Sequence, residues 1–329
     1  MRTIRKIIQY VLPLSVAFLL LGYAYRDFQF HELATQFQEA KLSWIVLSII
    51  VSLASHVVRA YRWKLLLQTL GFQLSLFKTF IALMVGYVSN LLAPRLGEIV
   101  RCSVLKRSTG IPTSNSLGTV AAERTIDFVS LLAVVGFTLA IAFKRLKATL
   151  YEVALVNIPT VAAKALFLGG LLLLMLVGLL LRAVSGRPSL QEHAVLLKSK
   201  LFLKEMLKGL NSIRALSAKK TALSITVLMW VLYYFAGYVG VFAIVETSEL
   251  GWIAGLSILA MSSISITLPI QGGIGAYHLL VNSTLMAYGI SRESGMLYAT
   301  LMHSAQLLAT IAVGGLSVIF SALMDKKGS

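Results

Sequence analysis

Apolar segments long enough to cross a membrane fill nearly the whole of this chain, and they restrict its fold more than any motif does. Of its 329 residues, 57% are hydrophobic and only 13% are charged, an apolar excess that a water-soluble domain of this length does not need. Several apolar runs approach the roughly 20 residues that an α-helix needs to cross a hydrocarbon core. The composition therefore predicts an all-α polytopic membrane protein with a single membrane domain, 1–329.

Basic residues outnumber acidic residues by 30 to 13, which gives the chain a net charge of +17. In a soluble protein this excess would suggest nucleic acid, but in a membrane protein basic residues collect in cytoplasmic loops beside anionic headgroups. Basic residues at the two ends, Arg2, Lys6, Lys326 and Lys327, place both termini in the cytoplasm. We therefore expect a multi-pass protein of the cell (inner) membrane and no nucleic-acid partner.

Two apolar stretches, 77–93 and 252–268, are each followed by the sequence Pro-x-x-Gly. The proline and glycine are Pro94 and Gly97 in the first case, and Pro269 and Gly272 in the second. Proline removes a backbone donor and glycine allows unusual dihedral angles, so each sequence should break a helix. Breaks at matching places in two halves of a hydrophobic chain indicate a transport site.

The charges after the first break decide its topology. If the stretch 77–93 crossed the membrane completely, Arg95, Arg101 and Lys106 would lie outside, against the positive-inside rule. A re-entrant hairpin that enters and leaves on the cytoplasmic side avoids this conflict. The second interrupted segment then forms a hairpin of opposite sense.

The expected architecture is an inverted repeat of six transmembrane helices and two re-entrant helical hairpins. The first repeat is 1–150 and the second is 151–329, with a basic cytoplasmic insertion at about 183–220 that reads as an amphipathic helix on the inner leaflet. Inverted repeats place their site near the midplane, where the hairpin tips meet. The six spans are expected at about 7–25, 44–64, 116–143, 161–181, 223–245 and 296–323.

The first candidate cluster follows the first apolar stretch. Charges inside a membrane are costly, and they usually pair and take part in function. A salt-bridged hairpin tip that only stabilises the fold is the alternative. The residues are Asn90, Arg95, Glu98 and Arg101, with the structural breaks Pro94 and Gly97.

The second cluster is Glu123, Arg124 and Asp127, near the start of a long apolar helix. Glu123 and Asp127 are one turn apart and share a face. Three arrangements stay open. Arg124 could lie free for an anionic headgroup, the carboxylates could pair with Arg95 and Arg101 across the site, or the three charges could neutralise one another.

The third cluster follows Pro269 and consists of Gln271, Gly272, Gly273, Gly275 and His278. Glycine-rich backbone after a break can present free N–H groups to phosphate. Close packing of helices is the commoner use of glycine in membranes, and His278 could be a hydrogen-bonded structural residue.

Arg59 and Arg62 lie on one face near the end of the expected second span, with Tyr61 and Trp63 beside them. Arginines in such a position usually snorkel to the interface, so an inner-leaflet anchor is the favoured interpretation. The alternative is a phosphate-binding edge of the site.

The sequence contains no protease, esterase, P-loop or metal-ligand motif, so we expect no cofactor, no metal and no catalytic residue. An acid–base pair of Glu98 and Asp127 remains conceivable. The single cysteine, Cys102, excludes an intrachain disulfide.

These residues resemble the flippase-like transmembrane domain of lysylphosphatidylglycerol synthases and its stand-alone relatives. The similarity covers nearly the whole chain and rests on the three clusters above. The family usually has Pro-x-Pro-Gly-Gly-x-Gly with Glu three residues later, whereas this chain has Gln271 for the second proline and His278 at the Glu position. The aminoacyl-transferring domain of the fused relatives is absent.

The resemblance implies a lipid flippase or scramblase that moves polar phospho- or glycolipids between leaflets. Membrane lipids with anionic or phosphate-bearing headgroups are the expected partners, bound by Arg95, Arg101 and Arg124. A membrane enzyme or accessory subunit acting on a lipid-linked substrate is the alternative, with a glycosyl- or aminoacyl-transferase as a possible partner. A transporter of small solutes is a third.

Overall fold

The computed structural model describes residues 15, 18–25, 37–155, 219–268 and 270–326. All regular elements in these ranges are helical, so the expected all-α fold is confirmed for the described part of the chain. The elements are α3 (Leu42–Gln68), α4 (Leu76–Leu92), α5 (Leu96–Thr109), α6 (Thr113–Leu155), α9 (Lys219–Tyr238), η2 (Val239–Ala243), α10 (Trp252–Thr267), η3 (Gln271–Gly273), α11 (Ala276–Ala287) and α12 (Arg292–Lys326).

Four helical segments in the described ranges are long and apolar enough to cross a membrane. They are Leu42–Gln68, Thr113–Phe143, Lys219–Ala243 and Arg292–Leu323, and they coincide with four of the six expected spans. The expected span at 161–181, most of the span at 7–25 and nearly all of the basic insertion at 183–220 lie outside the described residues. The count of six spans therefore stays a prediction.

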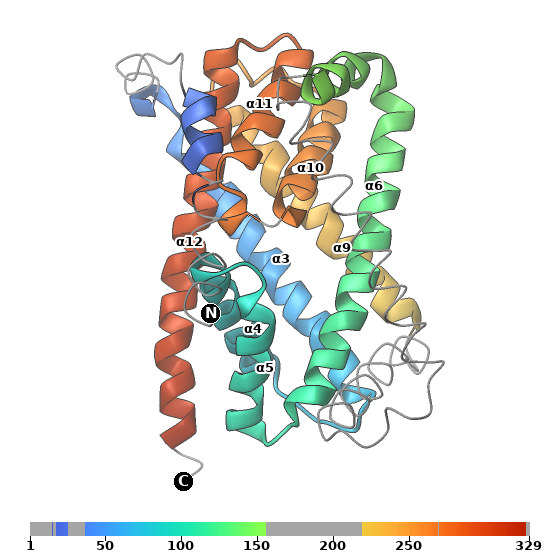
Figure 1. The fold of residues 1–329 in the computed structure, drawn as a ribbon, viewed down its shortest axis with the longest axis vertical. Coiled ribbons are helices and arrows are strands. Elements are labelled where there is room, and N and C mark those ends of the chain that lie inside the picture. Colours follow the sequence, from blue (N-terminus) through green and yellow to red (C-terminus); the bar gives the residue numbers. More distant parts are fainter. Residues whose placement is uncertain (1–14, 16–17, 26–36, 156–218, 269, 327–329) are drawn as a thin grey trace, which may run out of the picture.

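The first interrupted segment folds back on itself at the predicted break. α4 and α5 form an antiparallel pair in the lower half of the molecule (Figure 1). Arg95, in the turn between them, has a left-handed backbone with φ of 64°. Asn90 closes the turn, because its Oδ1 accepts a hydrogen bond from the N–H of Gly97 at 2.8 Å.

Two glycines allow the backbones of this hairpin to touch. A Cβ atom on Gly86 would lie 2.8 Å from the carbonyl oxygen of Gly97, and one on Gly97 would collide with the carbonyl oxygen of Gly86. Only residues without a side chain fit such a contact, which is the usual role of small residues between membrane helices.

The second interrupted segment, α10–η3–α11, occupies the upper half of the molecule (Figure 1). Gly272, Gly273 and Gly275 all have positive φ, which explains the glycine-rich sequence at this turn. Pro269, which we predicted as the break, lies outside the described residues.

The tips of the two hairpins meet. Nε2 of Gln271 donates a hydrogen bond to the backbone carbonyl of Leu92 at 3.0 Å. Leu91 packs beside Gly272 in the same region. The prediction that the two interrupted segments come together is therefore confirmed.

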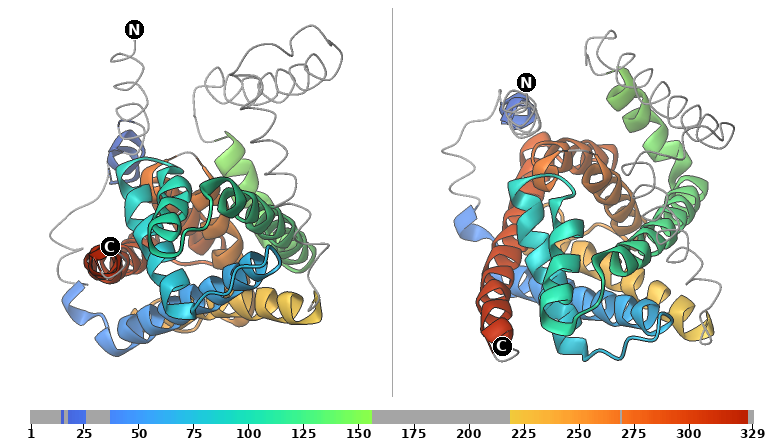
Figure 2. Two further views of the ribbon diagram at one scale, coloured as in Figure 1. Left: turned by 90° about the horizontal axis from the view of Figure 1, so that it is seen from below. Right: turned by 60° about the horizontal axis from the view of Figure 1, so that its bottom comes forward.

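The long helices surround the hairpins. Viewed from below, α12, α3 and α6 lie around the α4–α5 pair (Figure 2). α3 is joined to α9 by Ser48, whose hydroxyl donates to the carbonyl of Ala236 at 2.6 Å. α12 is joined to α9 by Tyr298, whose hydroxyl donates to the carbonyl of Gly237 at 2.6 Å. These two hydrogen bonds hold α9 against both α3 and α12.

Candidate functional site: a buried arginine–carboxylate network

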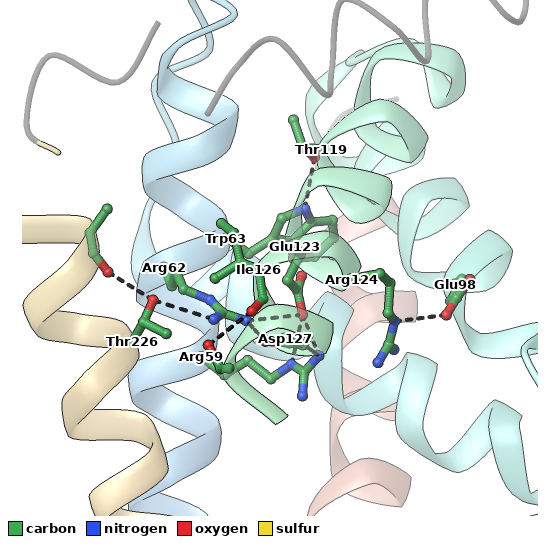
Figure 3. Close-up of polar contacts among 12 residues, drawn as sticks. Arg59, Arg62, Trp63, Glu98, Thr119, Glu123, Arg124, Ile126, Asp127 and Thr226 are labelled. Atoms are coloured by element: carbon green, nitrogen blue, oxygen red, sulfur yellow. Dashed lines mark hydrogen bonds and ion pairs between the residues drawn. The ribbon is translucent and has the colours of Figure 1, made fainter. Parts of the chain in front are cut away.

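The network is built on two carboxylates of α6, Glu123 and Asp127, and two arginines of α3, Arg59 and Arg62 (Figure 3). Nε of Arg59 donates to Oε1 of Glu123 at 2.7 Å, and its Nη2 donates to Oδ2 of Asp127 at 2.7 Å. Nη2 of Arg62 binds the other oxygen of Asp127. The two arginines lie about one turn apart on α3 and the two carboxylates lie about one turn apart on α6, so the two pairs of side chains face each other.

Arg101 of α5 supplies a third guanidinium. Its Nη1 lies 3.1 Å from Oε2 of Glu123, and its Cζ lies 4.5 Å from the centre of the Trp63 ring. The indole N–H of Trp63 donates to Oγ1 of Thr119 at 3.0 Å and holds the ring in place (Figure 3). Glu123 therefore contacts arginines from two different elements.

Two further helices complete the surroundings of the network. The hydroxyl of Tyr233 on α9 lies 3.2 Å from Nη1 of Arg59, and Oγ1 of Thr226 lies 3.4 Å from Nη1 of Arg62. The Tyr87 ring of α4 lies 5.9 Å from Cζ of Arg59. Five helices, the consecutive α3 to α6 and the distant α9, thus converge on the same group of charges.

The charges are buried and do not balance. Glu123 is 0% exposed, Arg62 1% and Arg101 3%. Three guanidinium groups, on Arg59, Arg62 and Arg101, face two carboxylates, which leaves one positive charge in excess. A buried charge costs several kcal/mol of desolvation, by an order-of-magnitude figure, unless partners compensate it.

Arg101 also has unused donors. Its Nε and Nη2 are buried and have no hydrogen-bond partner among the described residues. These two N–H groups lie along one edge of the planar guanidinium and form the fork that matches two oxygens of a phosphate or a carboxylate. A buried donor without a partner in the protein indicates strain, a functional role, or a partner such as water or an ion.

A second ion pair lies beside the network. Nε of Arg124 is 2.9 Å from Oε1 of Glu98, and these side chains are 44% and 28% exposed (Figure 3). Of the arrangements that the sequence left open, the one in which Arg124 lies free is therefore not observed. Glu98 and Asp127 pair with different arginines rather than with each other, which gives the proposed acid–base pair no support.

The structure combines parts of the three arrangements that the sequence left open. Glu123 pairs with Arg101, as one arrangement predicted, but Arg59 and Arg62 supply the other partners. Arg95 is exposed, and no ion pair joins it to a described residue. Mutual neutralisation within 123–127 does not occur, because each charge pairs with another helix.

The interpretation of Arg59 and Arg62 as an inner-leaflet anchor is wrong. Their side chains are 10% and 1% exposed and point into the protein. The signal that could have found them is their spacing, since two arginines one turn apart match two carboxylates one turn apart.

The third cluster forms a separate group around the start of α11. Gln271 lies at the hairpin tip, and Nδ1 of His278 accepts a hydrogen bond from the N–H of Gly275 at 3.4 Å. Within the ranges that the structure covers, no ion pair or side-chain hydrogen bond joins it to the network. Those ranges also contain no group of three or more His, Cys, Asp or Glu residues that could hold a metal ion.

Long apolar helices around a buried polar centre, with two helical hairpins meeting beside it, define an integral membrane protein. The chain belongs to the family of the lysylphosphatidylglycerol synthase transmembrane region, whose model matches residues 10–314. The resemblance seen in the sequence is thereby confirmed.

A UPF0104 membrane protein, MJ1595 of Methanocaldococcus jannaschii, is 26% identical to this chain over 111 residues. The matched part is 32% of this chain and 33% of that protein, so the chain spans about a third of the length of this curated relative. No solved structure matches the chain.

Proposed function

We propose that this protein is a lipid flippase or scramblase that moves polar phospho- or glycolipids between the leaflets of the cell inner membrane. One observation carries the proposal: Arg101 presents two unused, buried N–H donors within a charge network that has one positive charge in excess. A singly charged phosphate group would supply both missing oxygens and balance the charge.

The energetics favour this class of ligand. A donor left without a partner inside a membrane protein costs about 1–3 kcal/mol, and an unbalanced charge costs more. A phosphodiester offers two acceptor oxygens in the geometry of the arginine fork. The headgroup would enter the polar centre while its acyl chains stay in the bilayer.

We propose further that the two hairpins are re-entrant and enter from opposite faces, in an inverted repeat with both termini cytoplasmic. α4 has 17 residues and α10 has 16. At about 1.5 Å per residue each is about 25 Å long, which is shorter than a hydrocarbon core of about 30 Å. The bond between Gln271 and Leu92 supports a meeting of the tips near the midplane.

The test is a leaflet-exposure assay in proteoliposomes with a panel of headgroups. Arg101→Lys keeps the positive charge but loses the fork, so we expect the initial rate of lipid movement to fall by about tenfold or more. Lys106→Gln, an exposed position on the same helix, is the matched control and should retain the wild-type rate.

Two results would overturn the proposal. Wild-type protein that moves no lipid of the panel faster than empty vesicles has no flippase or scramblase activity. Unchanged movement in Arg101→Lys would show that the fork does not bind the headgroup.

A further inference from the structure

A cavity lies away from the arginine–carboxylate network, between the helix at 18–25, the start of α11 and the middle of α12. Its volume is about 560 Å³, within the range of about 300–1,000 Å³ that small-molecule sites occupy. In Figure 1 the 18–25 helix is the dark blue helix at the upper left, beside α12. Phe18, Leu21 and Leu307 form much of its apolar wall.

One end of this cavity is polar. His278 and His303 both line it, with ring centres 5.1 Å apart, and Ser304 lies beside them. Nε2 of His303 is buried and has no hydrogen-bond partner in the part of the chain that the structure covers. Tyr25 and Thr300 are hydrogen-bonded to each other through their hydroxyls and close the adjacent wall.

The described residues that line the cavity include no Lys, Arg, Asp or Glu. A charged headgroup would therefore lose its hydration there without gaining an ionic partner, which is costly. A hydroxyl group can donate to or accept from an imidazole nitrogen, so it suits His303 whichever nitrogen carries the proton.

The surroundings of the cavity indicate how a ligand would reach it. Phe18 and Leu308 are 64% and 65% exposed, and in a membrane protein such residues face acyl chains. A ligand with an apolar body can therefore enter sideways from the bilayer.

We infer that this cavity binds an uncharged lipid with a hydroxyl headgroup, of the class of diacylglycerols and long-chain alcohols. The inference goes beyond the proposed function, because the arginine–carboxylate network selects an anionic headgroup and this cavity excludes one. His278, which belongs to the third candidate cluster of the sequence, here lines the polar end of a site for a neutral group.

The test is photolabelling of the full chain in phosphatidylcholine nanodiscs with a diazirine-bearing diacylglycerol. Label should appear on peptides containing residues 18–25 and 300–307. Unlabelled diacylglycerol and oleyl alcohol should compete, whereas phosphatidylglycerol and an alkyl methyl ester should not. Equal competition by phosphatidylglycerol would overturn the ligand class, and equal competition by the methyl ester would remove the role of the hydroxyl.

The location of the site is tested with two glycine variants. A Cβ atom on Gly22, which lines the cavity, would meet no atom within 4 Å, so Gly22→Phe should fill the cavity and largely abolish labelling. Gly315→Phe on α12 is the matched control, because its Cβ would also meet nothing within 4 Å and Gly315 does not line the cavity. Equal labelling of both variants would contradict the assigned site.

The role of His303 is tested in the same assay. His303→Leu should weaken competition by diacylglycerol by about tenfold, whereas His303→Gln keeps a hydrogen-bonding group and should weaken it less. Arg101→Lys should label as wild type does, which separates this site from the proposed flippase activity. If diacylglycerol competed as strongly in His303→Leu as in wild type, His303 would have no role in binding the hydroxyl group.

Discussion

At the scale of single residues, Glu123 is the carboxylate that contacts all three arginines of the buried network. It is fully buried and contacts Arg59, Arg62 and Arg101 from two helices. Its partners could not be predicted from the sequence, because periodicity shows which face a charge occupies but not which helix packs against that face. The choice of Glu123, Asp127 and Arg101 as candidates was possible because charges are costly within apolar helices.

Glu123→Gln should strongly destabilise the protein. The substitution keeps the shape of the side chain but leaves three arginines facing Asp127 alone, and removing one partner of a buried ion pair costs about 3–5 kcal/mol. Unfolding in detergent, followed by denaturant titration, measures the change. Glu98→Gln, in the partly exposed pair with Arg124, is the control and should cost about 1 kcal/mol or less. Equal losses in both variants would mean that the network contributes no more than a surface pair.

Among the residues that the structure describes, Arg95 is the one non-glycine residue with a positive φ, of 64°. It is exposed in the turn between α4 and α5. A left-handed backbone costs an L-residue about 1–2 kcal/mol, and glycine avoids this cost. Glycine also increases the conformational entropy of the unfolded chain, which offsets part of the gain in stability. Arg95→Gly should therefore raise the free energy of unfolding by about 0.5–1 kcal/mol. Lys106→Gly, inside α5, should lower it by about 1 kcal/mol. A destabilised Arg95→Gly would show that the arginine side chain stabilises the turn.

At the scale of elements, the α4–α5 hairpin depends on the contact between Gly86 and Gly97. The sequence predicted the hairpin because proline, glycine and the following charges mark the turn. It did not predict the contact between Gly86 and Gly97, because these residues lie on opposite arms and their contact depends on how closely the two helices pack. The glycines of 272–275, in contrast, predict a break in the helix from the sequence alone, and their positive φ angles agree with that prediction.

Gly86→Ala should separate the two arms of this hairpin. The added methyl group would lie 2.8 Å from the Gly97 carbonyl oxygen and 3.1 Å from Cβ of Arg101, so it should displace the arginine as well. We expect a loss of about 1–3 kcal/mol in stability, as for other overpacked cores, measured by thermal unfolding in detergent. Gly136→Ala on α6 meets nothing within 4 Å and should be neutral or slightly stabilising through helix propensity. A Gly86→Ala protein as stable as Gly136→Ala would mean that the arms can separate without cost.

At the scale of the whole molecule, two hairpins of opposite sense place a polar centre inside an apolar protein. The charges near the base of each hairpin predict its orientation in the membrane. Lys106 and Arg107 lie in the last turn of α5, whereas Glu246 and Glu249 are exposed in the segment between η2 and α10. From the positive-inside rule we therefore propose that the base of the first hairpin faces the cytoplasm and that the base of the second faces the opposite side.

Labelling with a membrane-impermeant maleimide tests this arrangement in a Cys102→Ala background, which removes the native, buried thiol. Lys106→Cys should react only from the cytoplasmic side, in inside-out vesicles. Glu249→Cys should react only from the outer side, in right-side-out vesicles. Because Gln271 and Leu92 join the two tips, opposite labelling of the two bases requires that the hairpins approach from opposite faces. Reaction of both cysteines from one side would leave the two hairpins parallel, and the arginine–carboxylate network would then lack a route for a headgroup from one leaflet to the other.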